Sequence, residues 1–499
     1  MRKLALLLPF LTLILAAFLL FHRLGRHELG KYDEARRGVN AIEMTGGGVH
    51  PLVPTYAGKP DHWGTKPPLL VWAQVAAMHF FGTTRFAVRF PSAVATLALV
   101  VLLLYWSHRA WGGYLAGAVA AAYTLGSAEF MSSHGARTGD FDALLTLFLA
   151  AQLYFIDAYV QSGKRRELWM FGLSLALAGW TKGVAGCFFL PGIGLWLLAR
   201  PEARRLLARP GIWVAGLGGL GTILLYYVLR ELVDPGYLQL VWDNELGGRY
   251  LNVSEGHDGA WYYYLDALWF DEGNYWQNFL IVPAVATLLG RRLPAAQLVG
   301  LVLASFLLVL SLGSTKLFWY KGPALPLIGM ILGGAAAHWW RLAAGRRRRW
   351  PEGAFLLTLL ATATTYALLV TYEQAHFHRP LRNFTAAVAP YAPAFGPAGL
   401  PQPFTLLAHG YQPEARFYVA GAQVQGDSVS MGYTLAPPMN VTGRWLPPEA
   451  LSPGQRVVVC HVNDWNYVDK GWSFRDLKQV ERCKLLLIGE PKDSSPDAG

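Results

Sequence analysis

Residues 4–21 read LALLLPFLTLILAAFLLF, and the polar sequence Tyr32-Asp33-Glu34-Ala35-Arg36-Arg37 follows shortly after. The apolar stretch carries no charge and is about long enough to cross a hydrocarbon core of roughly 30 Å. It therefore predicts a membrane-spanning helix that leaves the polar sequence on the far side. A cleaved signal peptide over residues 1–22 is the alternative, although the run is long for the apolar part of one.

The composition of the whole chain agrees with a membrane protein that crosses the bilayer many times. Of 499 residues, 53% are hydrophobic and only 15% are charged, and the mean hydropathy is +0.28. The formal net charge is +11, but the basic residues form short clusters between apolar runs. Such clusters are typical of topology signals in membrane proteins, so we do not expect nucleic-acid binding.

Apolar runs predict about eleven spans. With a cytoplasmic N-terminus, the basic clusters near 109, 164–166, 200–209, 291–292 and 341–349 all fall in cytoplasmic connections. The fifth and sixth runs are short enough to form a hairpin or a re-entrant pair. The runs lie near residues 4–22, 87–106, 113–131, 141–160, 168–181, 184–199, 212–230, 277–290, 296–313, 322–340 and 353–372.

The prediction is an all-α membrane domain over residues 1–372, with outer loops at 23–86 and 231–276, and a small C-terminal α/β domain over 373–499. Strand-like runs at 456–460 and 484–488 support the second domain. Cys460 and Cys483 lie in it and share an oxidising compartment, so they are candidates for a disulfide, whereas Cys187 lies in a span. We expect the tail after Pro491 to be disordered.

The first outer loop holds two candidate functional groups. Asp33 and Glu34 begin a predicted amphipathic helix over 32–45, where the helix dipole favours acidic residues and Arg36 or Arg37 could pair with them. A carboxylate at the membrane surface can also act as a general base. Lys66 precedes two prolines, which favour an extended backbone. It either extends to the membrane interface or provides a fixed charge for a phosphate.

Asp140 and Asp142 lie at the outer end of the fourth predicted span. Ionisable groups at such depth are costly and usually functional, although an ion pair between Arg137 and Asp140 would also explain one of them. An Asp-x-Asp sequence can bind a metal ion, but residues two apart on a helix do not share a face. A metal site is therefore not indicated, and no cofactor is expected.

The loop 231–276 is rich in carboxylates and has a single basic residue, Arg249, followed by His257 and the aromatic run Trp261-Tyr262-Tyr263-Tyr264. A salt-bridge centre and an interfacial aromatic belt are the ordinary explanations. Lys182 and Lys316 lie at outer turns, against the positive-inside trend. Lys66, Lys182, Arg249 and Lys316 together indicate an outer phosphate site. The chain has no GxxxxGK or HExxH motif, so neither an ATP-driven pump nor a zinc protease is supported.

Taken in their order along the chain, these residues resemble the motifs of the polyprenyl-phosphate-sugar-dependent glycosyltransferases of the GT-C fold. That family includes the lipid A aminoarabinose transferases and the protein O-mannosyltransferases. The resemblance covers residues 1 to about 340. It implies that Asp33, with Glu34 beside it, is the catalytic base and that Lys66 binds the donor phosphate. It further implies that the donor site includes Asp142, Lys182, Arg249, His257, Lys316 and Tyr320. Thr65 replaces an acidic residue of the aminoarabinose transferases, which puts both a metal and a lipid A acceptor in doubt.

The resemblance implies transfer of a sugar, with inversion, from a polyprenyl-phosphate carrier to a lipid, glycan or protein acceptor at the outer face of the inner membrane. Topology supports such a donor, because nucleotide sugars stay in the cytoplasm and the candidate site faces outward. A transporter or flippase for a lipid-linked or anionic substrate is the alternative, since cations would also line its path. The sequence does not identify the sugar or the acceptor.

Overall fold

The computed structural model describes residues 2–345 with gaps at 27, 31, 133, 255, 271–274 and 290–292, and then residues 394–395, 400–409, 412–435 and 450–492. It divides into two compact units. The first contains Met1–Leu24, Thr65–Ala73 and Arg89–Tyr372, and the second contains Gly25–Gly64, Gln74–Val88 and Glu373–Gly499. Parts of the first polar loop thus pack with the C-terminal region. The division at residue 372 stays a prediction.

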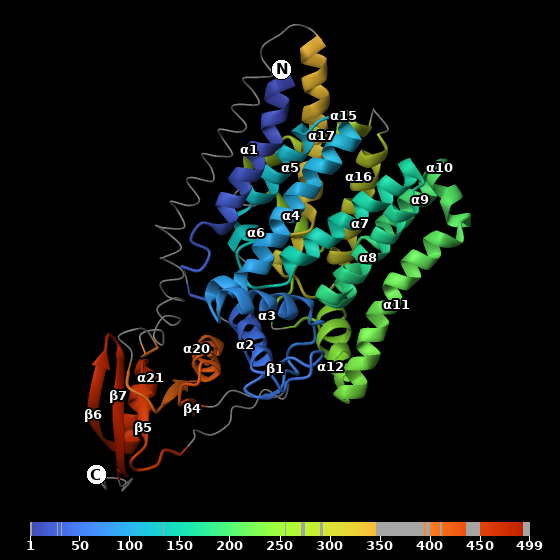
Figure 1. Cartoon of the computed structure of the whole chain (residues 1–499). Coiled ribbons are helices and arrows are strands. Elements are labelled where there is room, and N and C mark those ends of the chain that lie inside the picture. Colours follow the sequence, from blue (N-terminus) through green and yellow to red (C-terminus); the bar gives the residue numbers. More distant parts are fainter. Residues whose placement is uncertain are drawn as a thin grey trace. The chain divides into compact units, whose positions relative to one another are not determined.

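The first unit is helical. Proline at the first positions of α11 and α16 suits the start of a helix, and Gly163, at a φ of 66°, ends α7. The long helices α7, α8 and α11 lie side by side (Figure 1). The helices are α1 (Arg2–Phe21), α3 (Leu69–Phe81), α4 (Arg85–Trp111), α5 (Leu115–Gly126), α6 (Ala128–Ser132), α7 (Asp142–Ser162), α8 (Arg165–Lys182), α9 (Leu190–Ala199), α10 (Pro201–Arg204), α11 (Pro210–Val233), α12 (Tyr237–Val241), α13 (Tyr263–Trp269), α14 (Tyr275–Asn278), α15 (Ile281–Leu289), α16 (Pro294–Leu312) and α17 (Ala324–Gly345).

Four of the described helices are long and apolar enough to cross a membrane: α4, α7, α11 and α16. A fifth span results if α8 and α9, which are bent by 76° at a short break, count as one. These are the two short runs predicted as a hairpin or re-entrant pair. The predicted run 277–290 is divided between α14 and α15. The run 353–372 lies outside the described residues, and the count of eleven stays a prediction.

Small residues let α5 pack closely on α4 and on α17. A Cβ at Gly117 would collide with the backbone of α4 at Leu103 and Leu104, and one at Gly333 would collide with the backbone of α5 at Ala116. Close approach through small residues is the usual way in which membrane helices associate, because lipid tails are as apolar as the side chains. The α4–α5 interface therefore depends on Gly117, and the α5–α17 interface depends on Gly333.

The second unit contains the predicted small α/β domain. Its five-stranded sheet has the order β4-β3-β5-β7-β6, in which β3 is parallel to β4 and β5 while β7 is antiparallel to β5 and β6. The predicted runs at 456–460 and 484–488 form β5 and β7. The elements are β3 (Phe404–His409), α20 (Pro413–Val424), β4 (Val429–Leu435), β5 (Arg456–Val459), α21 (Val462–Gly471), β6 (Trp472–Val480) and β7 (Cys483–Pro491) (Figure 1).

Alternation along the strands gives this sheet two apolar faces. On β5, Val458 packs with Val419 of α20, whereas Val457 and Val459 pack with Val468 of α21. Helices thus cover both faces. The expected disulfide is present: Cys460 and Cys483 are bonded, with their Cα atoms 4.1 Å apart.

The second unit also includes α2 (Asp33–Thr45), the short strands β1 (Thr55–Tyr56) and β2 (Lys59–Pro60), and Gln74–Val88, which contains most of α3 and the start of α4. The predicted helix over 32–45 is therefore confirmed as α2. It packs on α20, where Phe417 lies against Gly38 at a distance that leaves little room for a side chain. Arg416 also donates to Glu43 across 3.0 Å. These contacts join the first loop to the C-terminal region.

Candidate functional site

A cavity of about 320 Å³ lies within the first unit and brings together five of the residues predicted for the donor site. Its apolar wall includes Leu145, Leu149, Phe188 and Phe306. Its polar wall combines side chains from the segment before α3, the start of α7, the end of α8, and the segments that follow α12 and α16. The charged residues of this wall are Lys66, Asp142, Lys182, Glu245 and Arg249, and Tyr320 lies among the further polar residues that line it.

Lys66 reaches the cavity from the segment just before α3, where the backbone bends. The neighbouring carbonyl of Thr65 accepts a hydrogen bond of 2.7 Å from the hydroxyl of Tyr237, which fixes this backbone. The ammonium group of Lys66 forms an ion pair with Glu245, and the hydroxyl of Thr65 donates to the same carboxylate across 2.5 Å. Lys66 is only 14% exposed at its side chain, so its charge is held in one place.

Burial and neighbouring charges shift the pKa values of this pair. Burial lowers the pKa of Lys66, Lys182 and Arg249 lower it further, and Glu245 opposes the change. Burial alone would raise the pKa of Glu245, but Lys66 outweighs it and brings that pKa to about 2. Glu245 is therefore ionised at neutral pH. A buried lysine surrounded by further cations favours an anionic ligand.

A second ion pair joins Lys182, at the C-terminal end of α8, to Asp142 at the start of α7. The ammonium group of Lys182 also lies 4.9 Å from the centre of the Tyr320 ring. Arg249 donates to the Tyr320 hydroxyl across 3.4 Å, and burial raises the pKa of that hydroxyl. Tyr320 thus keeps its proton, and its hydroxyl can donate a hydrogen bond to a ligand.

Glu245 and Arg249 both lie on a π-helix, Trp242–Tyr250. The amide of Leu251 donates to the carbonyl of Leu246 across 3.1 Å, five residues back. Turns of this type are rare and often occur at functional sites. The π-helix places two oppositely charged side chains, four residues apart, on the wall of one cavity.

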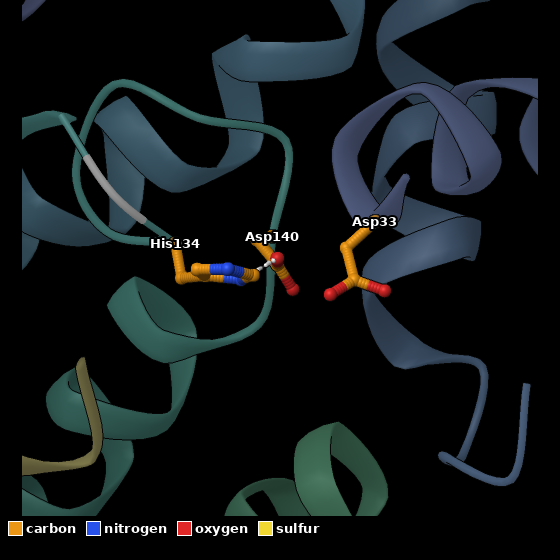
Figure 2. A group of neighbouring side chains, drawn as sticks. All are labelled: Asp33, His134 and Asp140. Atoms are coloured by element: carbon orange, nitrogen blue, oxygen red, sulfur yellow. Dashed lines mark hydrogen bonds and ion pairs between the residues drawn. The ribbon is translucent and has the colours of Figure 1, made fainter. Parts of the chain in front are cut away.

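Asp140 and Asp142 contact different partners. Asp140 forms a short contact with the ring of His134 (Figure 2). That ring stacks on Trp319, with ring centres 4.2 Å apart. Burial would raise the pKa of Asp140, but His134 and Lys182 hold it well below its ordinary range. Arg137 donates instead to the backbone carbonyls of Leu19 and His22. The Arg137–Asp140 pair considered from the sequence is therefore replaced by a His134–Asp140 pair.

Lys316 and His257 are not among the described residues that line the cavity. The ammonium group of Lys316 donates to the carbonyls of Ser311 and Gly313 at 2.7 and 2.5 Å, so it caps the end of α16. The side chain of His257 is exposed, and its carbonyl accepts from the amide of Lys316 across 2.8 Å. Their predicted roles in donor binding stay predictions.

Asp33 and Glu34 begin α2 in the second unit, and Figure 2 labels the half-buried Asp33. Glu34 accepts a hydrogen bond of 2.5 Å from the amide of Gly30. The adjacent Arg36, which the sequence suggested as a partner of these acids, binds both oxygens of Asp61 at 2.6 to 3.1 Å. The role of Asp33 as a base is not tested by this geometry.

Asp61 is a buried acceptor that the sequence analysis did not identify. It also accepts from Asn40 across 2.9 Å, and Arg37 lies 3.8 Å away. The amides of Trp63 and Gly64 donate to it across 3.1 and 3.0 Å. Bonds from amides two and three residues on form an Asx turn. The sequence Asp61-x-x-Gly64 is typical of such a turn, and it was the signal from which this role of Asp61 could have been predicted.

Several known glycosyltransferases are similar to this chain. Residues 65–227 match the family model described as dolichyl-phosphate-mannose-protein mannosyltransferase. An undecaprenyl phosphate-alpha-4-amino-4-deoxy-L-arabinose arabinosyl transferase 2 of Pseudomonas fluorescens is 27% identical over 344 residues, which are 67% of this chain and 61% of the relative. The corresponding transferase of Aeromonas salmonicida is 29% identical over 180 residues, 33% of this chain and 30% of that protein. The chain thus spans about three fifths of the first relative's length.

Solved structures show the same fold. ArnT of Cupriavidus metallidurans bound to undecaprenyl phosphate superposes with a TM-score of 0.66 at 17% identity, covering 95% of this chain and 97% of the other. The oligosaccharyltransferase of Archaeoglobus fulgidus tethered to an acceptor peptide gives 0.51 at 12% identity, covering 86% and 63%. The expected resemblance to GT-C polyprenyl-phosphate-sugar glycosyltransferases is confirmed, and the protein is membrane-embedded.

Proposed function

We propose that this protein is a glycosyltransferase that moves a sugar from a polyprenyl-phosphate carrier to a lipid, glycan or protein acceptor at the outer face of the inner membrane. The cavity of the first unit carries this proposal. It offers an apolar wall suited to a prenyl chain and a polar wall suited to a phosphate. The similar transferases described above support the same activity, and none of them is a transporter.

The charges that line the cavity fit a donor with one negative charge. Lys66, Lys182 and Arg249 provide three cations, while Asp142 and Glu245 provide two carboxylates. A sugar-phosphate-polyprenol is a phosphodiester and carries a single charge, which matches the surplus cation. Fixed donors around a phosphate stabilise the charge that develops as the leaving group departs.

The reaction balances without a further reactant. An acceptor oxygen or nitrogen attacks the anomeric carbon, and the bond from that carbon to the phosphate oxygen breaks with inversion. Its electrons pass to the polyprenyl phosphate, which Lys66 and Arg249 stabilise together with the Tyr320 hydroxyl. The acceptor proton goes to a carboxylate, for which Asp33 is our candidate and Glu34 its neighbour. No step requires a metal ion.

The test is donor binding and turnover by the full chain in detergent, with undecaprenyl-phosphate sugars as probes. Lys66→Ala should weaken donor binding and lower turnover by about 100-fold or more, because one fixed phosphate contact is lost. Lys164→Ala, an exposed lysine of another loop, is the matched control and should behave as wild type. Donor binding and turnover unaffected by Lys66→Ala would contradict the proposal.

A further inference from the structure

We propose that Glu245 promotes release of the product: it competes with the product phosphate for Lys66 and so weakens binding of the spent polyprenyl phosphate. This inference rests on the proposed function. It concerns a residue that the sequence analysis did not single out among the acidic residues of its loop. It also gives a role to the ion pair between Lys66 and Glu245, which both line the cavity.

The contacts of Glu245 explain why it can compete. It forms an ion pair with Lys66 and accepts a hydrogen bond of 2.5 Å from the hydroxyl of Thr65, which is 4% exposed. It lines the cavity beside Arg249, four residues further along the same π-helix. A phosphate bound by Lys66 and Arg249 would therefore lie beside a fixed negative charge.

The charge of the ligand changes during the reaction. The donor is a phosphodiester with one negative charge at any pH near neutrality. The product is a phosphomonoester whose second ionisation falls near pH 6, so it carries between one and two charges at pH 7. The cavity has a surplus of one positive charge, which is sufficient for the donor but not for the dianionic product. Glu245 repels the second charge and re-forms its ion pair as the product leaves.

Binding of undecaprenyl phosphate to the full chain in detergent tests this inference. At pH 8, Glu245→Gln should bind this probe about tenfold more tightly than wild type, because one nearby negative charge is removed. The gain should shrink at pH 5, where the probe has lost its second charge. In turnover, Glu245→Gln should lower both KM and kcat, since slower release limits the rate.

Asp243→Asn is the matched control, because it removes the same charge from the same π-helix at an exposed position. It should bind as wild type does. If Glu245→Gln does not fold, Thr65→Val removes one of the two contacts that hold Glu245 and should give a smaller gain in the same direction. No gain with the variant that folds would overturn the inference.

The outcomes separate the two proposals. Wild-type binding of the probe together with equal or weaker binding by Glu245→Gln at pH 8 would mean that Glu245 only orients Lys66, which contradicts the inference alone. A gain that is the same at pH 5 and pH 8 would also contradict it, because the second charge of the ligand would then play no part. No binding by wild type would contradict the proposed function and this inference with it.

Discussion

The side chains that were predicted from the sequence and meet in the cavity share one property. Lys66, Asp142, Lys182, Arg249 and Tyr320 each carry a charge or hydroxyl at a position where topology alone indicates an outer location. Glu245 was missed because its loop contains many acids, and its partner Lys66 is 179 residues away. Lys316 instead donates to backbone carbonyls a few residues before it. The sequence alone could not exclude this local pairing in favour of a role in donor binding. Only the folded structure shows which of these charged side chains face the cavity.

Asp33→Asn tests the base at the residue scale. The variant should fold and bind the lipid donor as wild type does, yet lose at least about 100-fold in turnover, because an amide cannot accept the proton of the acceptor. Donor binding and single-turnover transfer should be measured on the same purified protein. Near-normal turnover would return Asp33 to a role at the start of α2, where acidic residues suit the helix dipole.

Asp61→Asn should destabilise the second unit by about 3 kcal/mol, because Arg36 and Arg37 would lose a buried counter-charge. Asp476→Asn, in an exposed ion pair with Lys484 of the same unit, should cost less than about 1 kcal/mol. Thermal unfolding monitored by a reporter in the second unit gives both values. Equal losses would show that burial of the Asp61 network contributes little.

The same network predicts a pH dependence. Burial would raise the pKa of Asp61, but Arg36 and Arg37 hold it well below its ordinary value. A carboxylate with a depressed folded-state pKa stabilises the fold above its unfolded pKa of about 4, and this contribution is lost as the pH falls below that value. Wild type should therefore lose stability between about pH 4 and pH 2 more steeply than Asp61→Asn.

At the scale of elements, long apolar runs and alternating strands were predictable, whereas broken ones were not. The helix over 32–45 and the strands at 456–460 and 484–488 occur as expected. The run 277–290 looked like one span, but it is divided into α14 and α15, with Pro283 inside the latter. Strands β3, β4 and β6 had no separate prediction. β4 and β6 lie at the edges of the sheet, and β3 is a short, mostly buried run without alternation, which periodicity alone cannot distinguish from part of a helix.

The bond between Cys460 and Cys483 connects β5 to β7 and is testable by thiol labelling. Protein that is purified and denatured without reductant should react with one maleimide, at Cys187. After reduction it should react with three. The loop closed by this bond spans 23 residues, so its loss should cost about 3 kcal/mol in the chain-entropy model. Three labels without reduction would exclude the bond in the cell.

At the scale of the whole molecule, the direction of the C-terminal region follows from the alternation of basic clusters. A reporter that is active only in the cytoplasm, fused after Gly499, should be silent, and one active only outside should work. A fusion after Arg166, in a predicted cytoplasmic connection, serves as the control with the reverse result. Cytoplasmic activity after Gly499 would contradict the topology and with it the argument for a lipid-carried donor.

The second unit is built from Gly25–Gly64, Gln74–Val88 and Glu373–Gly499, and this division has a consequence for biogenesis. When the ribosome has finished α2, the residues of α20 that cover it have not been made. At about 5–20 residues per second, the apolar side of α2 stays uncovered for roughly 20–75 s of synthesis while the intervening helices insert. Nascent chains stalled before residue 400 should therefore need a chaperone or the insertion machinery to shield Val39 and Ile42.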